Sequence, residues 1–366
     1  MILREGWQPP RLSSEPLSAD LAIWDLRLIS VSSGYLISDI GEHFRAPERM
    51  SHSSILNAAY SSRAMKRRYE VWFVRCGLAD GSGAWWFRYL LMNLGRRGCS
   101  EEKTGKAVQI WATWFPFNAA PRTFIQSYTA DQLDLSARHQ LPFHFRAAEN
   151  AILEDSCRGN LLVEGHSISW NLRHRSSFGA VLSNKGWIGF SKSPHSDALF
   201  AGEIIFDNQR FSGAPVGFGV QGHNCGYRHR TFWRWTHAYF PRSSGSATTL
   251  EALVYDLPFG LLFRKAVVWH EGKAFILKNL REKEIIRARD RLRWVFAASF
   301  ADVAIEAVIE TAGPGIHQLL YAKTDCSGTL PVSNASLASA TLRIADHHRS
   351  EQFDTPSGAV LEMGGN

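Results

Sequence analysis

The chain has 366 residues, of which 45% are hydrophobic and 20% are charged. This composition is typical of a globular protein with room for two domains, and it excludes a disordered chain. The 41 Lys and Arg residues outnumber the 34 Asp and Glu residues, but they are scattered along the chain. We therefore expect a mixed, solvated surface rather than a nucleic-acid or membrane patch, despite the net charge of +7.

The cysteines are odd in number and form no CxxC pair. The N-terminus lacks the pattern of a signal peptide, and no run approaches the roughly 18 apolar residues of a membrane span. These features predict a cytoplasmic protein without a membrane span, in which the thiols are free. The five cysteines are Cys76, Cys99, Cys157, Cys225 and Cys326.

Most of the predicted elements are strands. Residues 1–50 show little periodicity and are expected to form a poorly structured extension. Aromatic and β-branched residues then alternate in short runs, and the first two runs flank a loop containing Asp80 and Gly81, which predicts a hairpin. The predicted strands include residues 69–74, 84–91, 108–115, 166–172, 266–270 and 294–311. Helical composition is limited to residues 130–138 and 277–293.

Residues 206–240 concentrate histidine, tryptophan, arginine and glycine more than any other segment. Turn signals at 206–208 and 213–219 predict a strand, a turn and a second strand. In the strand over 232–240, Trp233, Trp235 and His237 share one face, because side chains alternate across a strand. One face therefore carries two indoles and an imidazole.

The run from Gln221 to Gly226, which contains His223, Asn224 and Cys225, is the basis of a family resemblance. Together with residues 69–73, 84–91, 200–208 and 233–235, it resembles the lipocalin-like superfamily of carotenoid 1,2-hydratase, the AttH-like proteins and, more remotely, tocopherol cyclase. The resemblance covers residues 52–345. It implies an all-β fold of two consecutive lipocalin-like antiparallel β-barrel domains, over residues 51–200 and 201–366, with an aromatic-lined cavity.

Two positions depart from the pattern of the superfamily. Cys225 stands where the family usually has tryptophan. Gly222 stands where members that resemble the hydratase commonly have an acidic residue, which is proposed to protonate an alkene. The nearest acidic residues that precede it are Glu203 and Asp207.

The resemblance and the side-chain chemistry together predict the site. We expect His223 to donate a proton and Asn224 to orient the substrate, since burial and neighbours can bring the pKa of a histidine near working pH. The indole faces of Trp233 and Trp235 are suited to stabilise a carbocation. The other predicted substrate contacts are Phe218, Trp187, Cys225 and His237.

Each of these residues also has a structural interpretation. His223 and Asn224 can hydrogen-bond the turn backbone, Trp233 and Trp235 can be core residues, and His237 can be a buried core histidine. The spacing of His223, His229 and His237 matches no standard zinc motif, and the chain has no phosphate loop or dinucleotide fingerprint. We therefore predict neither a metal nor a cofactor.

Three functional hypotheses remain at this stage. The first is an enzyme that acts on a hydrophobic isoprenoid or polyketide-like substrate by acid-assisted hydration, cyclisation or isomerisation. The second is a non-catalytic carrier of an apolar small molecule, which would need few converging polar groups. The third and weakest is carbohydrate binding on aromatic platforms. The sequence does not specify the oligomeric state.

Overall fold

The computed structural model describes residues 52–61, 68–94, 107–185, 188–242, 247–346 and 349–365. The predicted extension over residues 1–50 and Trp187 lie outside the described residues. Helical structure in this part of the chain comprises α1 (His52–Asn57) and the single turns η1 (Ala130–Gln132) and η3 (Pro258–Gly260). Among these helices, none has the length and apolar character needed to cross a membrane.

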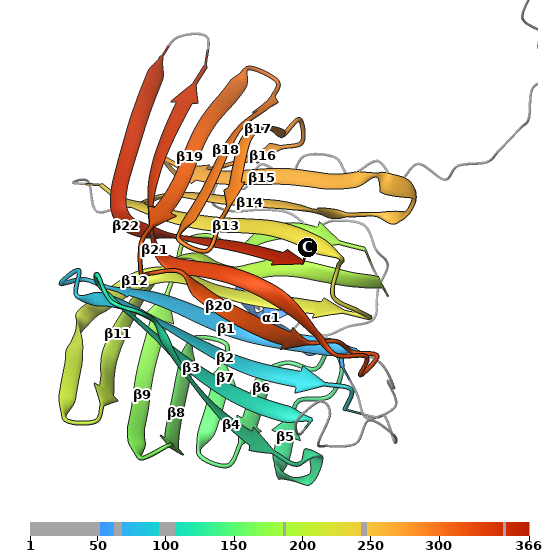
Figure 1. Cartoon of the computed structure of the whole chain (residues 1–366), viewed down its shortest axis with the longest axis vertical. Coiled ribbons are helices and arrows are strands. Elements are labelled where there is room, and N and C mark those ends of the chain that lie inside the picture. The colour runs from blue at the N-terminus through green and yellow to red at the C-terminus, as the bar shows by residue number, and fades with distance from the viewer. Residues whose placement is uncertain are drawn as a thin grey trace, which may run out of the picture. The chain divides into compact units, whose positions relative to one another are not determined.

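The first antiparallel sheet has twelve strands (Figure 1). Its first strand, β1, pairs with β2 on one side and with the last strand, β12, on the other. The strands are β1 (Tyr69–Leu78), β2 (Gly83–Met92), β3 (Val108–Pro116), β4 (Arg122–Tyr128), β5 (Leu133–Leu135), β6 (His144–Ala147), β7 (Asn150–Leu153), β8 (Ser156–Val163), β9 (His166–Arg175), β10 (Ala180–Asn184), β11 (Gly189–Phe206) and β12 (Gln209–Gly226).

The second antiparallel sheet has ten strands and repeats this arrangement, because its first strand, β13, pairs with both β14 and the last strand, β22. Figure 1 shows it in yellow to red, with the long β21–β22 hairpin corresponding to β11–β12. The strands are β13 (Phe232–Pro241), β14 (Ala247–Asp256), β15 (Leu262–His270), β16 (Lys273–Leu277), β17 (Arg281–Arg287), β18 (Arg291–Phe300), β19 (Val303–Ala312), β20 (His317–Ala322), β21 (Thr329–Ala345) and β22 (Ser350–Gly365).

The strand predictions hold in most places. The first hairpin forms as β1 and β2, and residues 294–311 form β18 and β19. The helical interpretation of residues 277–293 is wrong, since β17 lies at the edge of the second sheet. Its charged residues form cross-strand pairs, Lys283 with Glu306 and Glu284 with Arg293, which stabilise a strand as well as they would a helix. Of residues 130–138, only the turn η1 is helical.

The expected breaks at residues 213–219 do not end a strand. The pairing of β11 with β12 shifts register between Phe200 and Gly202, and β12 continues through the irregularity to Gly226. A β-bulge bends a strand without terminating it. The change from the first sheet to the second therefore falls between Gly226 and Phe232, later than position 201, which lies inside β11.

Three apolar layers explain why several strands have continuous hydrophobic runs. Each sheet encloses a core of its own. A third cluster joins the two sheets and includes Phe73, Trp86 and Val220 of the first with Trp235 and Val360 of the second. Every residue of β2 is buried, because both of its faces are covered.

The three described free thiols, Cys76, Cys157 and Cys225, are buried. Burial raises the pKa of each thiol above its ordinary value, so they are held in the neutral form. Cys326 is disulfide-bonded, and the prediction of a free thiol is wrong for this residue. The predicted cytoplasmic compartment stays a prediction.

A buried arginine connects the sheets. Arg75 of β1 has no exposed surface, and its guanidinium donates hydrogen bonds to backbone carbonyls of β21 and β22. These include Ser336 O at 3.2 Å from Nε and Ser357 O at 2.9 Å from Nη2, with Gly358 O at 3.4 Å from Nη1. Burial lowers the pKa of Arg75 to about 10, so the side chain remains charged at neutral pH.

A buried carboxyl group makes the reciprocal contact. Glu251 of β14 accepts hydrogen bonds from the hydroxyls of Ser193 and Ser196 on β11, at 2.8 and 2.7 Å. Burial raises the pKa of Glu251 to about 7, and the two serine hydroxyls oppose this shift only in part. Each sheet therefore places buried ionisable groups against polar groups of the other.

We expect Arg75→Met to lower the free energy of unfolding by about 2–4 kcal/mol, because it leaves buried carbonyls without donors. Urea titration of the full chain measures the change. Arg264→Met is the matched control, since Arg264 is exposed on β15 and should change stability by less than about 0.5 kcal/mol. Equal unfolding midpoints for the two variants would contradict the role assigned to Arg75.

Candidate functional site

The described residues enclose a pocket between β1, β2 and β12 of the first sheet and β13, β14, β20 and β22 of the second. Its volume is about 120 Å³. Both aromatic and polar side chains line it, contributed by strands far apart in the sequence. They include Tyr69, Phe73, Trp86, Arg88, Asn224, Arg228, His229, Arg230, Trp233, Trp235, Tyr255, Tyr321 and Glu362.

Stacked rings form one wall of the pocket. The Tyr69 and His229 rings lie nearly parallel with their centroids 4.1 Å apart. Trp233 stacks at 6.1 Å on Tyr321, and its ring lies across Gly364 of β22. A Cβ atom on Gly364 would approach the indole to 2.1 Å, so glycine allows Trp233 to lie flat on the strand.

Glu362 places a carboxylate in this aromatic surrounding. It is 8% exposed, and it accepts hydrogen bonds from Trp233 Nε1 at 2.8 Å and from the Tyr321 hydroxyl at 2.9 Å. The Asn334 amide makes a longer contact of 3.3 Å. Because all three donors are neutral, the carboxylate is held in a defined position without a neutralising ion pair.

His229 is the imidazole of the pocket. Burial, reinforced by the nearby charge of Arg88, lowers the pKa of His229 to about 3. The ring is therefore neutral at physiological pH, and its Nδ1 atom is buried without a hydrogen-bond partner. A neutral imidazole with an unused nitrogen can donate or accept a hydrogen bond, depending on its tautomer.

Arg88 of β2 is the buried cation of the pocket. Its guanidinium carbon lies 4.3 Å from the Tyr321 ring centroid, 4.8 Å from that of Trp111 and 5.6 Å from that of Trp86. The side chain is 6% exposed. Aromatic faces thus cover the guanidinium plane on more than one side.

His223, the predicted proton donor, is fully buried and does not line this pocket. Its Nδ1 lies 2.7 Å from Leu56 O, its Nε2 lies 2.8 Å from Glu70 Oε1, and its ring stacks on Trp72 at 4.5 Å. Leu56 O and the Glu70 carboxylate thus occupy both ring nitrogens. The pair of His223 and Glu70 fixes α1 against β1 and β12.

The other predicted residues divide into two groups. Asn224, Cys225, Trp233 and Trp235 line the pocket. Phe218 instead stacks on Tyr239 at 4.7 Å, and His237 Nε2 lies 2.7 Å from Ser196 O of β11. As the alternation predicted, Trp233, Trp235 and His237 share the face of β13 that meets the first sheet.

The fold shows where the alternative acidic residues lie and why position 222 has no acidic side chain. Glu203 pairs with Arg210, and Asp207 pairs with His166, both at the β11–β12 hairpin and away from the pocket. A Cβ atom on Gly222 would lie 2.1 Å from the Phe73 ring. The Phe73 ring therefore occupies the space that an acidic side chain at position 222 would need.

The pocket residues that were not predicted from the sequence include Tyr69, Arg88, His229, Tyr321 and Glu362. Tyr69 and Arg88 belong to runs that entered the family resemblance only as strands. Glu362 lies 129 residues from Trp233 and has no local signal of function. Only the pairing of β13 with β22, in which Trp235 faces Glu362, brings them together.

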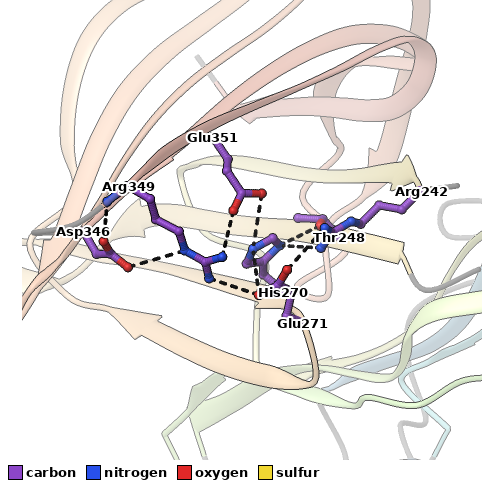
Figure 2. A network of polar contacts seen from close by, with 7 residues as sticks. All are labelled: Arg242, Thr248, His270, Glu271, Asp346, Arg349 and Glu351. Atoms are coloured by element: carbon purple, nitrogen blue, oxygen red, sulfur yellow. Dashed lines mark hydrogen bonds and ion pairs between the residues drawn. The ribbon is translucent and has the colours of Figure 1, made fainter. Parts of the chain in front are cut away.

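A second polar cluster lies where β15 and β21 end and β22 begins (Figure 2). His270, Glu271 and Glu351 form the one group of three possible metal ligands found among the described residues. Arg349 already bridges the two carboxylates, at 3.0 Å from each, and Arg242 contacts Glu271 on the other side. The arginines supply the compensating charge, and we interpret the cluster as a surface ion-pair network.

Comparison with solved structures identifies the fold. Kievitone hydratase from Nectria haematococca aligns with 86% of this chain and 95% of its own, at 11% identity and a TM-score of 0.51. CghA with Sch210972 aligns over the same shares at 10% identity and a TM-score of 0.53. No family model and no curated protein matches the sequence. The predicted fold of two lipocalin-like β-barrel domains is confirmed, and the resemblance to the superfamily is supported at the level of the fold.

We expect Glu70→Gln to lower the free energy of unfolding at pH 7 by about 3 kcal/mol, since it removes the carboxylate of a buried pair with His223. Burial acts to raise the pKa of Glu70, but hydrogen bonds from His223, Ser61 and Tyr60 outweigh it and hold the pKa below 4.5. The stabilisation is therefore complete above pH 4.5 and is lost as the pH falls through the lower folded value.

Urea titrations of the wild type and Glu70→Gln between pH 3 and pH 7 test this expectation. The difference between the two proteins should shrink at the acid end. A difference that stays constant over the whole range would show that Glu70 is not ionised in the folded protein.

Proposed function

We propose that this protein is an enzyme that transforms a hydrophobic, isoprenoid or polyketide-like small molecule by acid-assisted hydration, cyclisation or isomerisation. The observation that carries the proposal is Glu362, a carboxylate held by Trp233 and Tyr321 inside an aromatic pocket between the two barrels. Apolar pockets with a few converging polar groups are the usual sites of small-molecule chemistry.

The proton-transfer role goes to Glu362 in this proposal, and not to His223. Glu362 lines the pocket, whereas both nitrogens of His223 are occupied on the inner side of the first barrel. The carboxylic acid form of Glu362 gives a proton to the substrate. The carboxylate then takes a proton back from the added water or from a neighbouring carbon, so no redox cofactor is consumed.

The aromatic residues have a separate role. Protonation of an alkene leaves positive charge on carbon, and Trp233, Trp235 and Trp86 line the pocket where it would develop. Aromatic rings stabilise such a charge. Asn224, which faces the pocket from β12, orients the substrate. A pocket between two sheets can also hold a flexible substrate in a folded conformation, which lowers the entropic part of the barrier.

Two findings support an enzyme over a carrier. Several polar groups, Glu362, His229, Asn224 and Arg88, converge on one pocket, which simple retention of an apolar ligand does not require. In addition, one of the solved structures with this fold is a hydratase and another holds Sch210972. Pure retention of an unchanged ligand is the competing outcome of the experiment below.

The test is incubation of the full chain with an organic extract of its source organism, followed by mass spectrometry of bound and released compounds. We expect Glu362→Gln to lower turnover by at least about 100-fold, because general acid–base groups contribute 10²–10⁴-fold. Ligand affinity should change by less than about tenfold, since glutamine still accepts hydrogen bonds from Trp233 and Tyr321.

Glu203→Gln is the matched control, because Glu203 is a half-buried carboxylate paired with Arg210 outside the pocket. It should turn over substrate at the wild-type rate. If the wild type and Glu362→Gln retain a compound equally and leave it unaltered, the protein is a carrier and the proposal of an enzyme is wrong.

A further inference from the structure

We propose that the ligand of the pocket is an organic acid, with a hydrophobic body and one anionic oxygen group that Arg88 binds. The inference deepens the proposed function and rests on the pocket being its substrate site. The anionic group is a carboxylate, an enolate or another oxyanion, since all of these present an acceptor to a guanidinium in the same way.

The first observation is that Arg88 has unused donors. Its Nε and Nη1 atoms are buried without a hydrogen-bond partner, and the guanidinium otherwise interacts with the Tyr321 hydroxyl. Buried polar groups are nearly always paired, and a buried charge without a partner is costly. Arg88 lines the pocket, so a bound ligand is in a position to supply the missing acceptor.

The carboxylate of Glu362 does not fill this role. Its oxygens accept from Trp233, Tyr321 and Asn334, and no ion pair joins Glu362 to Arg88 within the described part of the chain. Aromatic rings at 4.3–5.6 Å cover the guanidinium faces. The N–H groups at the edge of the guanidinium are thus the part left for a ligand.

The charge of the pocket lining is the second, independent observation. The described lining residues include three arginines, Arg88, Arg228 and Arg230, against one carboxylate, Glu362. His229 is neutral at physiological pH, because burial and Arg88 lower its pKa to about 3. Three positive charges against at most one negative charge leave a net charge of at least +2, which favours an anion over a neutral or cationic ligand.

Contrast with Arg75 shows what distinguishes Arg88. Both arginines are buried between the sheets, but Arg75 donates to a set of backbone carbonyls and is satisfied within the protein. Arg88 has no comparable set of acceptors. A structural role therefore accounts for Arg75 and leaves the donors of Arg88 unexplained.

The experiment compares two fluorescent probes that differ by one anionic group: anilinonaphthalene sulfonate and its neutral analogue phenylnaphthylamine. We expect the wild-type full chain to bind the sulfonate at least tenfold more tightly, since a hydrogen bond to a charged group contributes about that much or more. In Arg88→Met this preference should fall to about threefold or less, while affinity for the neutral probe stays near the wild-type value.

The neutral probe also reports whether Arg88→Met is folded. Arg173→Met is the control for overall charge, because Arg173 is exposed on β9, outside the pocket. It removes the same charge and should keep the tenfold preference.

Equal affinity of the wild type for the two probes would overturn the inference, and so would an undiminished preference in folded Arg88→Met. The binding measurement is independent of turnover. A protein that prefers the sulfonate but alters no compound would retain the Arg88 assignment and lose the proposed function.

Discussion

The hydrogen bonds from Arg75 to the carbonyls of β21 and β22 are the interaction on which the rest of the structure depends. Each sheet has an apolar core of its own. The pocket, however, lies between the sheets and exists only while the two are held in register. A buried charge is suited to this task, because its hydrogen bonds are directional whereas apolar contact between two sheets is not.

The layer between the sheets combines two kinds of polar group. Some are satisfied within the protein, as are Arg75 and the Glu251 carboxyl with its two serine hydroxyls. Others, Arg88 and His229, have donors or acceptors that the protein leaves unused. Satisfied groups fix the geometry, and the unused groups beside Glu362 give the pocket its capacity to recognise a ligand. The unsatisfied polar groups thus mark the functional part of the layer between the sheets, and the rest of that layer serves packing.

The sequence predicted the strands better than it predicted their pairing and tertiary contacts. Alternation placed Trp233, Trp235 and His237 on one face, and that face does meet the first sheet. Local patterns failed where tertiary contacts decide: β12 continues through its glycines because β11 bends with it, and β17 is a strand because β18 pairs with it. For the site, the sequence singled out Asn224, Trp233 and Trp235, which line the pocket, and His223, which does not.

The residues alone determined an all-β chain, since periodicity two and glycine-rich turns are local properties of strands. Only the tertiary structure decided which polar side chains act together. Glu362 reaches Trp233 because β13 pairs with β22. Arg88 is buried at the pocket because the second sheet, including Tyr321, covers that face of β2. A carboxylate and an indole 129 residues apart become neighbours through strand pairing, and that pairing leaves no trace in either local sequence.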